Sequence, residues 1–372
     1  MEQNRSCIGL DALTVSNLKI ERIENIERLM RTQGVRVQYT EDNQQNYVAI
    51  SKDGCVRMLD IRDEKKFNRL ILGVKNGYIF STLALTVTNI LENNMDNVSW
   101  CMYNEYVEFI LKEYLPSMYG IYLRGEEMLI KTFEMNINIW LSQPYDAYNR
   151  ALENLWRSLP IRRAKNLRAG TKEKQVDSYC KRNKSIKVSL YNKTSEMEEK
   201  GELCKVPREQ HRLLRIELVL MERSKILDVL GTNRWHELND EIVAKRFDKA
   251  FEAYFVEPFQ KWQIQCSKML RTKIKKYRKC GRNWKSTLMA FLRDDKEYQI
   301  LDIEQIFAEL QDKNGNLSRI KKGFWDAEYK MDHSRYLNRD IEKVNEIFMA
   351  EKQIYLYTAE CIQQTKSDEQ KK

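Results

Sequence analysis

The sequence predicts an α+β fold: a duplicated antiparallel-sheet unit with helices on one face, followed by an all-helical C-terminal domain. Two observations indicate this. Short β-rich runs alternate with two helical stretches in the first part of the chain, and almost everything afterwards is helical in pattern. A length of 372 residues is enough for two domains. We therefore expect a sheet domain over residues 1–221, with two sheet units split near residue 125, a helical domain over 222–364 and a disordered tail over 365–372.

The first sheet unit is predicted from runs of β-branched and aromatic residues that end at Asp, Asn or Gly. The expected strands are Leu10–Leu18, Val35–Tyr39, Tyr47–Ser51, Cys55–Ile61 and Asn68–Val74. A helix should follow from about Asn97 to Met118, because apolar residues recur there near helical spacing. Pro116 should weaken its last turn.

The second unit repeats this order in outline. A strand at Met128–Leu141 leads to a helix that Ser142 could cap, with Pro144 in its first turn. Strands at Lys187–Asn192 and Leu213–Met221 complete the unit. Helices on one face would leave the other face of the sheet open to a ligand.

The helical part begins after residue 222. Helices are expected at Glu237–Lys276, Asn283–Arg293, Asp302–Gln311 and Ser334–Thr358, and Pro258 should kink or split the first of them. The segment Trp284–Phe324 could hold a helix-turn-helix made of three short helices. Three short amphipathic helices are equally expected in any small helical bundle, so both interpretations stand.

The charge favours an anionic partner. The chain has 64 Lys+Arg against 54 Asp+Glu, a formal net charge of +10, and nucleic acid is the commonest anionic partner of such a protein. An ordinary solvated surface can carry the same excess. Eight scattered cysteines without a CxxC pair and three isolated histidines make a zinc site unexpected. No apolar run suits a membrane helix and no leader is recognisable, so we expect a cytoplasmic protein.

Two basic stretches are candidate DNA-binding segments. The first, Lys268–Lys285, has no acidic residue and is interleaved with aromatics, and the second, Arg157–Lys174, should be a loop between helix and strand. A solvated helix face is the alternative for the first. The candidate DNA-binding residues are Arg162, Arg163, Lys165, Arg168, Lys268, Arg271, Lys275, Lys276, Arg278, Lys279, Arg282 and Lys285.

The residues best suited to chemistry lie near the end of the sheet region. In KVSLYNKTSEMEEKG at 187–201, the period of two places Tyr191, Lys193 and Ser195 on one face, with Glu196 where the strand ends. A tyrosine hydroxyl, with a pKa of about 10, is a poor nucleophile unless a cation stabilises its phenolate. Lys193 or a carboxylate-bound Mg²⁺ would supply that cation.

Two neighbouring runs add an arginine and carboxylates. Arg215 and Glu217 share a face of the strand LLRIELVL at 213–220, and Glu134 lies on the polar side of TFEMNINIWL. If these strands pair, the set suits metal-assisted phosphodiester transesterification. Ordinary cross-strand ion pairs are the alternative. A register slip of one residue would separate Tyr191 from Glu217.

These motifs resemble a known family. YNKTSE at 191–196 followed by LRIEL, together with FEMNINI at 133–139 and LILGVKN at 70–76, is similar to the filamentous-phage nicking and closing replication initiators of the gene II/X type, and more distantly to the Rep_trans plasmid initiators. The resemblance covers about residues 67–325. It implies a Rep nuclease-like fold in the sheet domain.

The resemblance also implies roles for individual residues. Tyr191 would attack the origin phosphodiester, Glu134 and Glu217 would hold Mg²⁺ or Mn²⁺, and Glu196 is a further acidic candidate. The chemistry of the side chains, and not the resemblance, gives Lys193 the role of stabilising the phenolate and Arg215 that of stabilising the transition-state charge. The expected partners are the single- and double-stranded DNA of a replication origin, with host helicase and polymerase as further partners.

The chain departs from the family in two ways. It has no paired histidine motif, so carboxylates must hold any metal. The plasmid initiators place their tyrosine after the Arg-x-Glu strand, but MERSKILDVLGTNRW at 221–235 contains none, which favours Tyr191. The expected function is rolling-circle initiation on a plasmid, phage or mobile element, through a phosphotyrosine intermediate. The alternatives are a non-catalytic DNA-binding replication or copy-control protein, and an interaction protein for an acidic partner.

Overall fold

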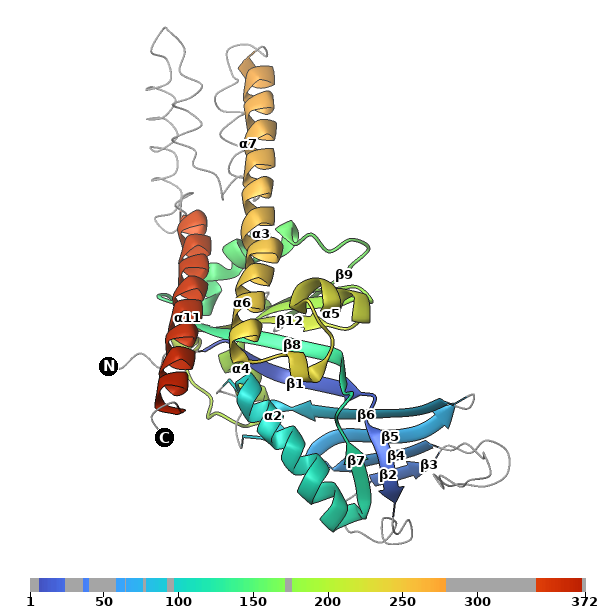
Figure 1. Cartoon of the computed structure of the whole chain (residues 1–372). Helices are drawn as coiled ribbons and strands as arrows, with labels where there is room; N and C mark the ends of the chain where they lie inside the picture. Colours follow the sequence, from blue (N-terminus) through green and yellow to red (C-terminus); the bar gives the residue numbers. More distant parts are fainter. Residues whose placement is uncertain are drawn as a thin grey trace.

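A single antiparallel sheet forms the centre of the molecule in the computed structural model, which describes residues 7–23, 36–39, 58–63, 65–75, 78–91, 97–170, 176–278 and 339–369 (Figure 1). Ten strands are hydrogen-bonded in the order β3-β4-β5-β6-β1-β8-β12-β11-β10-β9. Every neighbouring pair is antiparallel. Two further strands, β2 and β7, form a small separate sheet.

The strands are short except for β8. Their bounds are β1 Gly9–Ser16, β2 Lys19–Ile23, β3 Arg36–Tyr39, β4 Met58–Asp63, β5 Phe67–Lys75, β6 Tyr78–Thr86, β7 Ile121–Arg124, β8 Leu129–Trp140, β9 Lys165–Gly170, β10 Val176–Arg182, β11 Ile186–Asn192 and β12 Leu213–Leu220. The first strand, β1, pairs with both β6 and β8 and so joins the strands before residue 125 to those after it.

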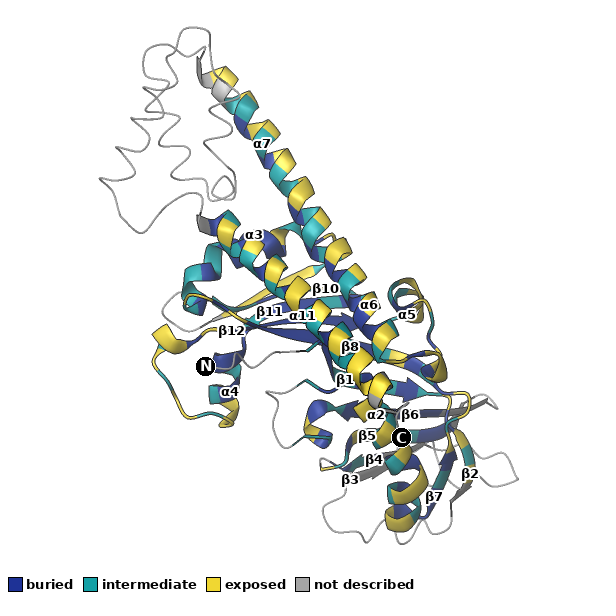
Figure 2. Ribbon diagram, turned by 60° about the vertical axis from the view of Figure 1, so that its left-hand side comes forward, coloured by how far each residue is buried: buried dark blue, intermediate teal, exposed yellow. Residues whose placement is uncertain are grey.

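Most helices lie over one face of this sheet (Figure 2), whereas α4 (Lys193–Lys200) contributes to the lining of a cavity over the other face. Their bounds are η1 Val87–Asn89, α2 Trp100–Phe109, η2 Ile110–Tyr119, η3 Tyr145–Tyr148, α3 Asn149–Ser158, α4 Lys193–Lys200, η4 Arg208–Gln210, α5 Arg223–Leu230, η5 Trp235–Glu237, α6 Asp240–Phe251, η6 Glu252–Val256, α7 Glu257–Arg278 and α11 Arg339–Glu369. Buried side chains of the strands and of α5, α6, α7 and α11 form one hydrophobic cluster. No helix among the described residues has the length and apolar character to span a membrane.

The α+β class is confirmed. The described helices after residue 222, however, do not form a hydrophobic core separate from that of the sheet. The described helices after that residue share the core of the sheet, because side chains such as Phe247 and Ile347 pack into the same cluster as Ile137 and Leu218. The expected strands at Val35–Tyr39, Cys55–Ile61 and Asn68–Val74 correspond to β3, β4 and β5, and Leu10–Leu18 to β1. Strands β2, β6, β7, β9 and β10 were not expected from the sequence.

Prolines change the helices without breaking them. Pro258 is the second residue of α7, and the π-helical turn η6 directly before it joins α6 to α7. Pro116 lies within the π-helical η2, where the missing N–H is accommodated by the wider turn. Both expected helices are therefore continuous through a local change of winding.

The end of the chain departs from its expected disorder. Helix α11 continues to Glu369, and Thr365 donates a hydrogen bond to the Cys361 carbonyl at 3.1 Å. The segment TKSDE contains no glycine or proline to end a helix, which explains the continuation. The strand at Tyr47–Ser51, the helices at Asn283–Arg293 and Asp302–Gln311, and the helix-turn-helix segment lie outside the described residues.

One buried carboxyl on α11 predicts a pH-dependent stability. Glu351 is 4% exposed, and burial, followed by the charge of Asp248 on α6, raises its pKa to about 8 from 4.5. Between these values the unfolded chain has lost this proton while the folded chain keeps it, so stability falls as the pH rises. Glu351→Gln is expected to raise the free energy of unfolding at pH 8 by about 2–4 kcal/mol, with a smaller gain at pH 5. Urea denaturation at both values checks this, and equal gains would contradict it.

Candidate active site

The strand register places the chemistry-bearing residues on the face opposite most of the helices. Tyr191 on β11 lies directly across from Arg215 on β12, and Ser189 lies across from Glu217. The alternating residues of these strands, such as Leu190, point into the core instead. The register that the motif required is therefore present, with Tyr191 and Glu217 on the same face.

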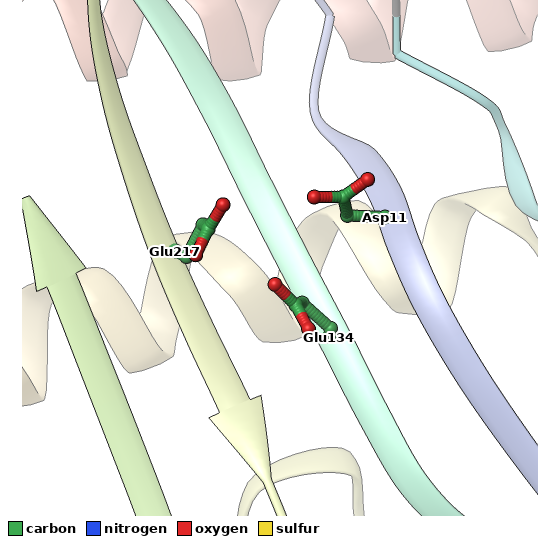
Figure 3. Close-up of side chains that lie close together, drawn as sticks. All are labelled: Asp11, Glu134 and Glu217. Carbon is green, nitrogen blue, oxygen red and sulfur yellow. The ribbon is translucent and has the colours of Figure 1, made fainter. Parts of the chain in front are cut away.

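Three carboxylates from three strands meet on this face. Asp11 of β1, Glu134 of β8 and Glu217 of β12 each offer an oxygen, and these oxygens lie within 4.8 Å of one another (Figure 3). In the close-up, all three side chains stand in front of the sheet while a helix passes behind it. Glu134 and Glu217 were expected here from the sequence, and Asp11 was not.

A β-bulge brings Asp11 to this position. Leu10 pairs with Met135 and Leu13 pairs with Phe133, so two residues of β1 lie opposite the single Glu134 of β8. Leu10 and Leu13 are both buried although an odd number of steps separates them. The sequence signal for this residue was the broken alternation in LDALTV, where an aspartate interrupts an apolar run.

The cluster has the properties of a cation site. Burial, followed by the neighbouring Glu217 and Asp11 charges, raises the pKa of Glu134, and burial together with Asp11 raises that of Glu217. The side chain of Asn136, across from Glu217, has an oxygen that is buried without a hydrogen-bond partner among the described groups. Hard oxygen donors that repel one another fit Mg²⁺ or Mn²⁺, since a divalent cation would relieve the repulsion.

The tyrosine is linked to this cluster directly. Tyr191 Oη donates a hydrogen bond to Glu217 Oε1. Burial, then the Glu217 charge, raises the pKa of Tyr191 well above its usual value of 10, and Arg215 opposes the rise. Arg215 is fully buried, and it donates to Asn138 Oδ1 at 2.8 Å and to Asp11 Oδ2 at 3.3 Å. Arg215, which lies directly across from Tyr191, therefore connects β8 to the carboxylate cluster.

Lys193 and Glu196 lie at the edge of this arrangement. The strand ends at Asn192, whose side chain caps α4 by accepting from the Ser195 amide at 3.2 Å, so Lys193 is the first residue of a helix and not a strand residue beside Tyr191. Lys193 is fully buried and forms an ion pair with Glu196. Burial and the nearby Arg215 lower its pKa.

Glu196 is held away from the other carboxylates. It forms ion pairs with Lys193 and with Lys200, both on α4. Burial raises the pKa of Glu196, but these two cations outweigh it and the net shift is downward. The structure therefore groups Glu134 and Glu217 with Asp11, and not with Glu196.

A cavity of about 630 Å³ opens over the site. Its lining includes Asp11, Glu134 and Glu217 at one end, Tyr191 beside them and Ala169 of β9 at the other end. It thus crosses the sheet from β1 to the edge strand β9. A second cavity, of about 690 Å³, lies beside η2 and β7 and includes none of these active-site residues in its lining.

The expected DNA-binding residues fall into three places. Arg162 and Arg163 form an exposed turn, and the segment after them is the edge strand β9 where a loop was expected. Lys165 on β9 shares the face of the active site, whereas Arg168 stacks over Trp156 and Tyr179 on the helix-covered face and pairs with Glu153. Helix α7 carries Lys268, Arg271, Lys275, Lys276 and Arg278, and Lys279, Arg282 and Lys285 lie outside the described residues.

Comparison with known proteins gives no match to a protein-family model and none to a curated protein. The site is therefore defined by its own geometry. Tyr191 and the three carboxylates line one cavity, to which α4 also contributes, and the buried Arg215 contacts Asp11 beside it. The three carboxylates could hold a divalent cation through their oxygens, and the Tyr191 hydroxyl lies beside them.

Proposed function

We propose that the protein initiates rolling-circle replication, nicking one strand of an origin through a phosphotyrosine intermediate and later closing it. The observation that carries this proposal is the hydrogen bond from Tyr191 to Glu217, a member of the three-carboxylate cluster. A nucleophile in contact with a metal-ligating carboxylate suits phosphodiester transesterification better than an ordinary cross-strand ion pair does.

Asp11, Glu134 and Glu217 would hold the metal. When bound, Mg²⁺ or Mn²⁺ polarises the phosphodiester and offsets the negative charge that develops on its oxygens. Arg215 contributes a positive charge beside Tyr191, which opposes the effect of burial on the tyrosine pKa and favours the phenolate. Lys193 is the first residue of α4, two positions after Tyr191. Its ion pair with Glu196 fixes the start of this helix.

The chemical step uses residues already in contact. The Tyr191 oxygen attacks the phosphorus while its proton passes to Glu217, the P–O3′ bond breaks, and the leaving oxygen takes a proton to give a free 3′-OH. The 5′-phosphate stays on Tyr191. A host polymerase extends the 3′-OH, and closure is the reverse attack by a 3′-OH on the phosphotyrosine.

A duplicated sheet unit is the finer fold that we propose. Its support is the order of strands on the two sides of the β1–β8 pair: β6, β5, β4 and β3 follow on one side, and β12, β11, β10 and β9 on the other. In each half the last strand in sequence lies next to the central strand. The basic residues of α7 would then hold the origin duplex.

Detection of a covalent adduct tests the proposed activity. The protein is incubated with Mn²⁺ and supercoiled DNA of the replicon that encodes it, then digested and examined by mass spectrometry. A nucleotide on Tyr191 is the expected result. An adduct on another tyrosine would keep the reaction and move the site, and tight, salt-sensitive binding without any adduct would favour the non-catalytic DNA-binding protein.

A further inference from the structure

Three cations form a row across the outer strands of the sheet. Lys187 on β11 lies directly opposite Arg182 on β10, and Arg182 lies directly opposite Lys165 on the edge strand β9. Directly opposed residues of an antiparallel pair point to the same face. Lys165 is one of the DNA-binding candidates from the sequence, whereas Arg182 and Lys187 are not.

This basic row shares the face of the active site and leads to it. Lys187 lies two positions from Ser189 and four from Tyr191 on the same strand, and its Nζ is 3.7 Å from Glu217 Oε2. The cavity over the carboxylates includes Lys187 and extends across β10 to β9. Lys187 is the member of the row that lines this cavity, whereas Arg182 and Lys165 lie beside it, one alternate position further along their strands than Cys180 and Leu167.

The arrangement of charges is unfavourable for the sheet itself. Like charges directly opposite on neighbouring strands destabilise the pairing, and strands are only about 4.8 Å apart. Lys165 and Arg182 are exposed, and within the described part of the chain neither has a carboxylate partner. A sheet that keeps three cations in line has a surface suited to a ligand with closely spaced negative charges.

We propose that this row binds successive phosphates of single-stranded DNA beside the scissile phosphate. This inference rests on the proposed function, because it takes the carboxylate cluster as the point of cleavage. The carboxylates line a cavity of about 630 Å³, which suits the backbone of a single strand better than the wider duplex. In the adjacent row, Leu167 of β9 is 55% exposed opposite Cys180, an apolar surface on which unpaired bases would lie.

Salt-dependent binding of a labelled 20-nucleotide single strand tests the row. The variant K165Q/R182Q removes two of its cations, and K112Q/R124Q removes one lysine and one arginine from the exposed surface near η2 and β7 as a matched control. Fluorescence anisotropy is measured without metal over a series of salt concentrations. For K165Q/R182Q we expect roughly tenfold weaker binding at low salt. The slope of the logarithm of the binding constant against the logarithm of the salt concentration should be smaller in magnitude by about 1.4, since each phosphate contact on a single strand contributes about 0.7. The control should bind as wild type does.

Wild-type single-strand affinity in K165Q/R182Q would overturn the inference, and so would an equal loss in both double variants. If single-strand binding is unchanged but duplex binding is lost, the row is assigned to duplex DNA instead. The adduct assay on wild-type protein distinguishes failure of this inference from failure of the proposed nicking activity. If the row variant loses single-strand binding and the wild type forms no adduct, the binding surface stands and the nicking activity fails.

Discussion

Tyr191→Phe is expected to abolish nicking and the covalent adduct, lowering the rate by at least roughly 10⁴-fold. Among the described residues, Tyr191 has the hydroxyl group that donates a hydrogen bond to Glu217 of the carboxylate cluster. Phenylalanine fills the same space on β11 and removes only the hydroxyl. Binding of single-stranded DNA should therefore change little. Relaxation of supercoiled DNA in Mn²⁺, followed on agarose gels, measures the rate.

The control for this substitution is Tyr122→Phe. Tyr122 lies on β7, in the small separate sheet, and its replacement should leave nicking at the wild-type rate. Circular dichroism of both variants shows whether the fold is kept. A Tyr191→Phe protein that nicks as fast as wild type would remove this residue as the nucleophile.

Glu134→Gln is expected to abolish the stabilisation of the folded protein by a divalent metal ion. Binding of Mg²⁺ or Mn²⁺ at one hundred times its dissociation constant stabilises a folded protein by about 2.7 kcal/mol, which is a rise of a few degrees in Tm. Wild type should show this rise and Glu134→Gln should not. Without metal, the variant should be at least as stable as wild type, since one of three mutually repelling carboxylates is gone.

Glu196→Gln is the matched comparison, because both glutamates were metal candidates from the sequence. Glu196 pairs with Lys193 and Lys200 and stands apart from the cluster, so its variant should keep the metal-dependent rise in Tm. Differential scanning fluorimetry with and without metal gives both values. Loss of the rise in Glu196→Gln with retention in Glu134→Gln would place the metal elsewhere.

Local patterns predicted the strands whose side chains alternate cleanly. The strand LLRIELVL and the end of KVSLYN correspond to β12 and β11 within a residue, since one face is apolar and the other polar. The edge strand β9 has no such pattern. Its residues KNLRAG are almost all exposed and its pairing with β10 defines it, so the sequence favoured a basic loop.

The site was predictable where it depends on one strand and not where it depends on several. Tyr191, Arg215, Glu134 and Glu217 follow from period two and the motifs. Asp11 depends on a bulge in the pairing of two strands more than a hundred residues apart, which no local pattern records. Glu196 lines the same cavity but pairs with Lys193 and Lys200 of its own helix, because α4 begins at Lys193, directly after the strand.

The pairing of β1 with β8 makes the site a late product of synthesis. Arg215 and Asp11, which contact each other, are separated by 204 positions in the chain. Asp11 leaves the ribosome early and acquires its complete set of partners only after β12 has been translated. A prematurely terminated chain that ends before β12 would contain the tyrosine without Arg215 or Glu217 and would leave DNA intact. The proposed cleavage would therefore require completion of the sheet.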